Sequence, residues 1–161
     1  MAIDILLDIE GVTGESKITG YEGKIDILSW NWGMNNSGDM HSGGGGGSGK
    51  VDVHDISITK FLDKSTPTLT KNCCTGNHFT KAKLVVRKAG GDSPVEYLVL
   101  ELKKVLITGI HSGGGQGDDR ITEDITLNFA EYKLIYKPQS DTGTAEAPVE
   151  IGWSMETNQE V

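Results

Sequence analysis

Four histidines are the side chains of this sequence best suited to bind a metal ion: His41, His54, His78 and His111. Zinc sites usually show closely spaced ligands, such as H-x-x-x-H or Cys-x-x-Cys. Neither of these two motifs occurs here, and both His41 and His111 stand in glycine-rich segments. We therefore expect solvated loop histidines, with no bound metal or other cofactor.

A glycine-rich segment comes close to a phosphate-binding loop. Gly44, Gly49 and Lys50 have the spacing G-x-x-x-x-G-K, but Val51 stands where Ser or Thr should hold magnesium. The motif should also lead from a strand into a helix, whereas Val51 opens a segment with strand character. The segment is interpreted as a flexible loop and not as a nucleotide site.

The sequence shows no motif that would supply the nucleophile and base of a hydrolase. The sequence contains no G-x-S-x-G elbow. Ser42 and Ser112 each follow a histidine, but adjacent side chains of an extended chain point to opposite faces. Asp118 and Asp119 are expected in a solvated loop, because a calcium loop needs more oxygen ligands at fixed positions. We predict that the protein is not an enzyme.

Length and composition indicate one globular domain over residues 1–161. Glycine accounts for 22 of the 161 residues, about twice its usual share, which predicts long glycine loops. The formal net charge of -8 disfavours nucleic-acid binding, because that affinity depends largely on Lys and Arg. The adjacent Cys73 and Cys74 are expected as free thiols of a reducing compartment.

No segment suggests a membrane or an export signal. The first residues lack a basic start, and Asp4 and Asp8 interrupt the apolar run. No stretch approaches the ~20 apolar residues that span a bilayer. We expect folding in the cytoplasm, no membrane insertion, and any secretion to proceed without a cleaved signal.

Apolar residues recur mostly at every second position, which is typical of strands with one buried face. Strands are predicted at 3–9, 25–34, 51–60, 81–88, 95–110, 121–136 and 149–155. The third changes phase near Asp55, which predicts a bulge or break. In the last, Val149, Ile151, Trp153 and Met155 should point inward. The fold class is therefore mainly β, antiparallel, with two packed sheets or a closed barrel.

One helix is predicted, over residues 65–76. Ser65 or Thr66 can cap its first turn, and Pro67 suits the first helical position. Gly76 suits the left-handed residue that ends a helix.

The second strand carries two tryptophans on one face. Trp30 and Trp32 are expected in the core because each ring buries a large area. Ser29 and Asn31 then point outward, and on a ring-shaped assembly they could line a central channel.

Specific segments, in order along the whole chain, resemble the Hcp family, the haemolysin-coregulated proteins of type VI secretion. These segments are Gly14-Glu15-Ser16-Lys17, residues 25–34 (IDILSWNWGM), residues 40–47 (MHSGGGGG), Asp63-Lys64-Ser65-Thr66-Pro67, Arg87-Lys88-Ala89-Gly90-Gly91, and Asp119-Arg120-Ile121-Thr122-Glu123 leading into residues 127–130 (LNFA).

The resemblance implies a compact β-barrel of two sheets with one short helix. It implies that six copies form a ring, that rings stack into a tube inside a contractile sheath, and that a valine-glycine-repeat spike protein caps the tube. It also implies effector proteins bound in the ring lumen and ejected with the tube. The chain would lack the toxin extension of some family members.

Two sets of site residues follow from the resemblance. Ser29 and Asn31 are expected at the lumen, where they would contact effectors. The segment 35–50 resembles the family's extended loop between rings, and its expected stacking residues are Met40, His41, Gly43, Gly44, Gly45, Gly46, Gly47 and Lys50. The alternative function is a monomeric secreted β-sandwich that binds sugar or peptide, for which an exposed aromatic platform would be the mark.

Overall fold

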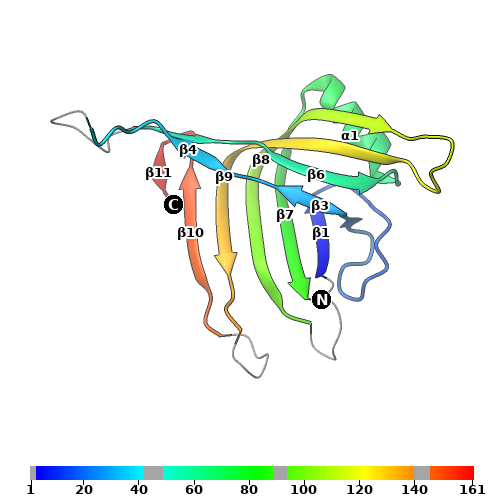
Figure 1. Cartoon of the computed structure of the whole chain (residues 1–161), viewed down its shortest axis with the longest axis horizontal. Helices are drawn as coiled ribbons and strands as arrows, with labels where there is room; N and C mark the ends of the chain where they lie inside the picture. The colour runs from blue at the N-terminus through cyan, green and yellow to red at the C-terminus, as the bar shows by residue number, and fades with distance from the viewer. Residues whose placement is uncertain (1–2, 42–48, 89–93, 140–145) are drawn as a thin grey trace.

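The computed structural model describes residues 3–41, 49–88, 94–139 and 146–161. In this part of the chain the fold is mainly β with one helix (Figure 1). The elements are β1 (Ile3–Ile9), β2 (Ile25–Asp26), β3 (Ser29–Asn31), β4 (Met34–Asn36), β5 (Val51–Val53), β6 (Ile56–Phe61), α1 (Ser65–Thr75), β7 (Phe79–Lys88), β8 (Glu96–Gly113), β9 (Thr122–Tyr136), β10 (Val149–Ser154) and β11 (Gln159–Glu160).

Two layers share one long hairpin, which is formed by β8 and β9. The larger layer has the order β11-β10-β9-β8-β7-β1-β2, and every pairing in it is antiparallel. The smaller layer places β3 beside β6, and β6 beside the first half of β9. Strand β9 thus pairs with β6 through Leu127 and with β10 from Glu131 onward. The predicted fold class, antiparallel layers packed around one core, is confirmed.

The long strands bend where they pass from one layer to the other. Lys104 in β8 has a left-handed backbone, with φ of 54°. Opposite it, the carbonyl of Ala130 accepts a hydrogen bond from the N–H of Met155 at 2.9 Å. Because a left-handed residue cannot continue a flat ladder, the hairpin turns here from one layer into the other.

The opposite corner is bridged by two hydrogen bonds. The N–H of Ile27 donates to the carbonyl of Ile5 in β1 at 2.9 Å, and the N–H of Leu28 donates to the carbonyl of Thr59 in β6 at 2.8 Å. Strands β2 and β3 are separate, so the barrel is not closed by a continuous ladder. The predicted single strand over 25–34 is therefore three short strands that change partner.

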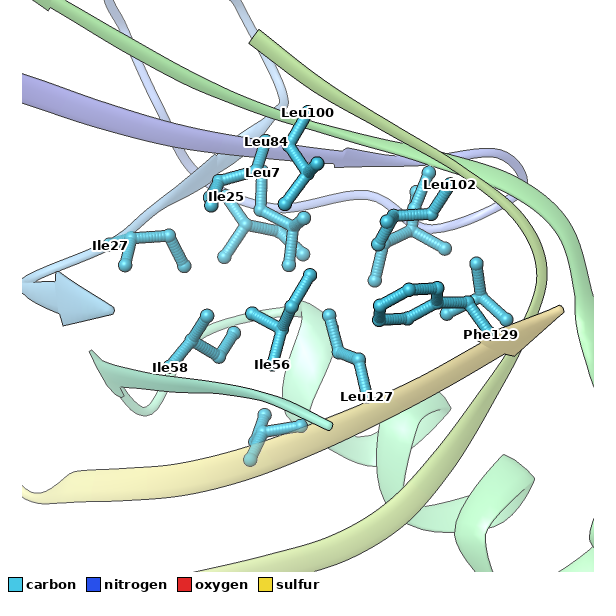
Figure 2. Close-up of a cluster of buried hydrophobic side chains, with 14 of the residues drawn as sticks. Leu7, Ile25, Ile27, Ile56, Ile58, Leu84, Leu100, Leu102, Leu127 and Phe129 are labelled. Carbon is cyan, nitrogen blue, oxygen red and sulfur yellow. The ribbon is translucent and has the colours of Figure 1, made fainter. Parts of the chain in front are cut away.

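The core lies between the layers. Figure 2 shows Leu7, Leu84 and Leu100 of the larger layer facing Ile56 and Leu127 of the smaller one. All five side chains are at most 1% exposed. Burying an aliphatic side chain of this size stabilises the fold by about 1.5–3 kcal/mol, so this cluster holds the layers together.

The helix begins differently from the prediction. Residue Lys64 precedes it and makes no side-chain cap, and neither Ser65 nor Thr66 caps it. Instead, the carboxylate of Asp63 accepts the N–H of Ser65 at 2.9 Å. The expected ending is confirmed, since Gly76 has φ of 73° and its N–H donates to the carbonyl of Asn72 at 3.0 Å.

Two further expectations need correction. The segment 35–50 is not only a loop, because β4 pairs with β5 and forms an arm that projects from the layers (Figure 1). In β10, Val149 and Ile151 are 66% and 47% exposed although their parity is inward, whereas Ser154 is buried. The smaller layer does not extend over this part of β10, so parity alone did not determine burial. The predicted break near Asp55 is confirmed, between β5 and β6.

Candidate functional site

Most side chains on the outward side of the smaller layer are short and polar, and the larger apolar ones are Phe61 and Leu106. Register alignment puts Asn31, Ser57, Thr126 and Gly109 in one row across the four strands. We call this surface the polar face. Its residues are Ser29, Asn31, Asp55, Ser57, Thr59, Phe61, Thr108, Gly109, His111, Gly113, Thr122, Asp124, Thr126 and Asn128.

Hydrogen bonds between neighbouring strands fix the side chains of this face. Thr59 donates its hydroxyl to Asp124 Oδ1 at 2.6 Å. Asp55 accepts the hydroxyl of Thr108 at 2.7 Å and the amide of Asn128 at 2.8 Å. Cross-strand pairs of this kind hold a sheet surface in one arrangement, so the face presents a preset pattern of polar groups.

Ser29 and Asn31 lie at the edge of the polar face. Both are exposed and point away from the core, while Trp30 and Trp32 on the other side pack against it. The predicted division of this strand into a tryptophan side and an outward polar side is confirmed. These two residues could be predicted from the sequence, but the rest of the face could not, because only the pairing of β3, β6, β9 and β8 shows that its residues belong to one surface.

The outer surface of the larger layer is chemically different. Long charged side chains cross it in ladders, for example Lys24 to Asp8 at 3.1 Å and Lys133 to Glu150 at 3.3 Å. We call it the ladder face. Acids and bases are nearly balanced on it, with eight acids, Asp4, Asp8, Glu10, Asp26, Glu96, Glu101, Glu131 and Glu150, against seven bases, Lys24, Lys81, Lys83, Arg87, Lys103, Lys133 and Lys137.

Aromatic packing anchors the arm to the layers. The ring of Trp32 contacts that of Tyr132 edge to face, with centroids 4.9 Å apart, and its Nε1 donates to the carbonyl of His54 at 2.9 Å. Burial raises the pKa of the Tyr132 phenol above its ordinary value. The arm therefore leaves the body from a rigid base.

Three of the predicted stacking residues are described, and they adjoin the strands of the arm in sequence. Met40 is 79% exposed, and His41 and Lys50 are exposed as well. Gly43, Gly44, Gly45, Gly46 and Gly47 lie outside the described residues.

A buried ionic cluster was missed by sequence analysis. Lys60 Nζ lies 2.6 Å from Glu123 Oε1 and 2.8 Å from Asp63 Oδ1, and the lysine side chain is fully buried. Thr66 donates its hydroxyl to Glu123 at 2.8 Å. The cluster joins α1 to β6 and β9. Its signal in the sequence is the parity of Lys60 and Glu123, which occupy inward positions next to Ile58 and Ile125.

The other candidate sites considered from the sequence are not formed in the described part of the chain. No three His, Cys, Asp or Glu side chains there gather as a metal site. His54 contacts the amide of Asn35 at 3.1 Å, while Cys73 and Cys74 are free thiols. Within the same residues, no helix is long and apolar enough to cross a bilayer.

Comparison with known proteins identifies the family. A sequence model described as the type VI secretion system effector Hcp matches residues 6–136. The chain is 50% identical over 159 residues to protein hcp1 of Pseudomonas aeruginosa, covering 98% of both chains. The chain belongs to the Hcp family.

Solved structures agree with this assignment. Hcp1 from Salmonella typhimurium aligns with a TM-score of 0.79 and 28% identity over the full length of both chains. A structure described as a type six secretion system protein aligns with a TM-score of 0.92 and 27% identity, over 99% of this chain and 100% of that one. As a member of the Hcp family, the protein is a subunit of the type VI secretion tube.

Proposed function

We propose that six copies of this chain form a ring whose lumen is lined by the polar face, and that stacked rings form the inner tube. The observation that supports this most is the contrast between the two sheet surfaces. The ladder face has the long Lys and Glu side chains usual for solvent, whereas the strands of the polar face expose mainly short hydroxyl, amide and glycine groups. Short side chains keep a channel open, and hydroxyl and amide groups offer hydrogen bonds to cargo.

Ser29 and Asn31 are the proposed cargo contacts at the edge of this face. Both side chains are exposed, so a protein in the lumen could reach them. Asn31 offers two donors and one acceptor. Effector proteins carried in the lumen would be held here weakly and reversibly.

The arm is the proposed stacking element. A ring needs a head-to-tail interface that closes, and stacking needs a second pair of complementary surfaces. The arm projects from the body on a rigid aromatic base, and it presents Met40, His41 and Lys50 to solvent. The predicted stacking residues Gly43 to Gly47 complete this proposed set and lie outside the described residues.

The remaining partners follow from the tube. We assign residues 1–161 as one tube-subunit domain with no catalytic role. It would assemble in the cytoplasm inside the contractile sheath, meet the valine-glycine-repeat spike protein at the tip, and leave the cell as part of the tube. Neither nucleic acid nor membrane insertion has a part in this function.

Electron microscopy of the purified protein, with its solution mass, tests the assembly. Six-fold rings with a matching mass are expected, and a monomer at micromolar concentration would contradict the proposal. The cargo contacts are tested by Asn31→Gln and Asn31→Asp, with Glu101→Gln on the ladder face as a control. If both Asn31 variants leave every lumen-type effector as stable as the original protein does, the placement of this residue is wrong.

A further inference from the structure

The polar face has an uneven balance of charge. Its outward-facing residues include the carboxylates of Asp55 and Asp124 and, apart from His111, no basic side chain. On the ladder face, by contrast, seven basic side chains stand among eight acids. One cation lies at the rim, where the guanidinium of Arg120 stacks over the ring of Phe61 at 3.9 Å from its centroid. Asp118 and Asp119 of the adjoining loop outweigh that single charge.

The carboxylates of Asp55 and Asp124 differ in their exposure, and therefore in how they can interact with cargo. Asp55 is half-buried and accepts hydrogen bonds from Thr108 and Asn128, so it contributes a fixed negative charge. Asp124 is exposed in the centre of the face, held by the hydroxyl of Thr59 at 2.6 Å. Its carboxylate can accept further hydrogen bonds, and an ionised donor forms the strongest of these.

Resting on the proposed lumen role of the polar face, we propose that this face selects protein cargo by charge and binds surfaces rich in Lys and Arg. The outward-facing neighbours of Asp124 are mainly hydroxyls, amides and glycine, so apart from His111 an approaching cation meets no basic side chain that points outward from these strands. In a closed ring the carboxylates of all copies would face one channel. Enclosure concentrates such a potential and favours cationic partners.

Fluorescence anisotropy with labelled decalysine and labelled decaglutamate, added to purified rings at low salt, measures this preference. We expect decalysine to bind and decaglutamate not to bind. Asp124→Asn keeps the acceptor for Thr59, and it should weaken decalysine binding about fivefold, which corresponds to ~1 kcal/mol of Coulomb attraction at contact distance. Charge reversal in Asp124→Lys should weaken binding further.

Glu101→Gln on the ladder face is the matched control, since it removes one exposed carboxylate from the same chain. If Glu101→Gln weakens decalysine binding as much as Asp124→Asn does, the peptide responds only to the net charge of the chain, and the inference is wrong. The second measurement uses a small helical domain prepared in a basic and an acidic version. Each version is mixed with rings and exposed to protease, and the fraction that remains uncleaved is measured. If rings protect both versions equally, the charge preference is wrong but the proposed lumen function stands. If the protein forms no rings, the proposed function itself is wrong.

Discussion

Replacing Lys60 by methionine should destabilise the subunit severely. The lysine ammonium lies within 2.8 Å of two carboxylates, those of Glu123 and Asp63, whose side chains are 0% and 9% exposed. In Lys60→Met these carboxylates would remain buried side by side without a cation. Breaking a buried ion pair by removing one partner costs about 3–5 kcal/mol.

This loss is large against the whole stability of a domain, which is typically about 5–15 kcal/mol. Urea unfolding followed by the fluorescence of Trp30, Trp32 and Trp153 measures it. Protein concentration must be held equal, because assembly raises the apparent stability of a subunit by mass action. The slope of the transition should stay constant while the midpoint falls.

Lys104→Met is the matched control for this measurement. Its ammonium lies 2.8 Å from Glu156, but both side chains are more than half exposed. An exposed pair contributes about 0–1 kcal/mol, so the control should unfold close to the original protein. The double variant Lys60→Met/Glu123→Leu removes one uncompensated carboxylate and should recover part of the loss. If the two lysine variants lose equal stability, the cluster does not hold the helix on the layers as we argue.

Three further predictions concern two glycine substitutions and the pKa of one carboxyl group. Gly14→Ala should destabilise by about 2 kcal/mol or more in urea, because the added Cβ would lie 2.5 Å from a backbone carbonyl oxygen, whereas Gly113→Ala meets nothing within 4 Å and should be nearly neutral. Gly76→Ala should lose about 1–2 kcal/mol of thermal stability because its backbone is left-handed, and an unchanged melting temperature would contradict this. Hydrogen bonds from the N–H groups of Glu22 itself and of Gly20 lower the pKa of the Glu22 carboxyl below 4.5. The stabilising contribution of this carboxylate is therefore present at neutral pH and is lost as the pH falls through the lowered pKa. A carboxyl titration followed by NMR measures this pKa, and a midpoint at or above 4.5 would refute the prediction.

Strands and the end of the helix could be predicted from local patterns. Alternation identified residues 3–9 as a strand, and Gly76 marked the end of the helix, because both depend on neighbours in the sequence. The cap of the helix was assigned wrongly because Ser65 uses its hydroxyl to bond Asp63 and not the first turn. Which residue acts as a cap depends on side-chain rotamers, which periodicity does not specify.

Surfaces made of distant segments could be predicted only in part. Asn31 and Ser29 were found because a tryptophan strand must have another side. Their neighbours Ser57 and Thr126 come from strands far along the chain, and only register puts them in one row. The exposed Val149 shows the same limit, since its parity is inward but the covering layer ends before it.

The hairpin of β8 and β9 gives the subunit a mechanical character. Because these two strands belong to both layers, a pull on either layer is carried directly into the other through continuous covalent chain. Sliding β8 along β9 would require many ladder hydrogen bonds to break together and not one after another. A subunit of the type VI secretion tube is thus expected to bear axial load with both layers together and to unfold in a single step, without the loss of one layer before the other.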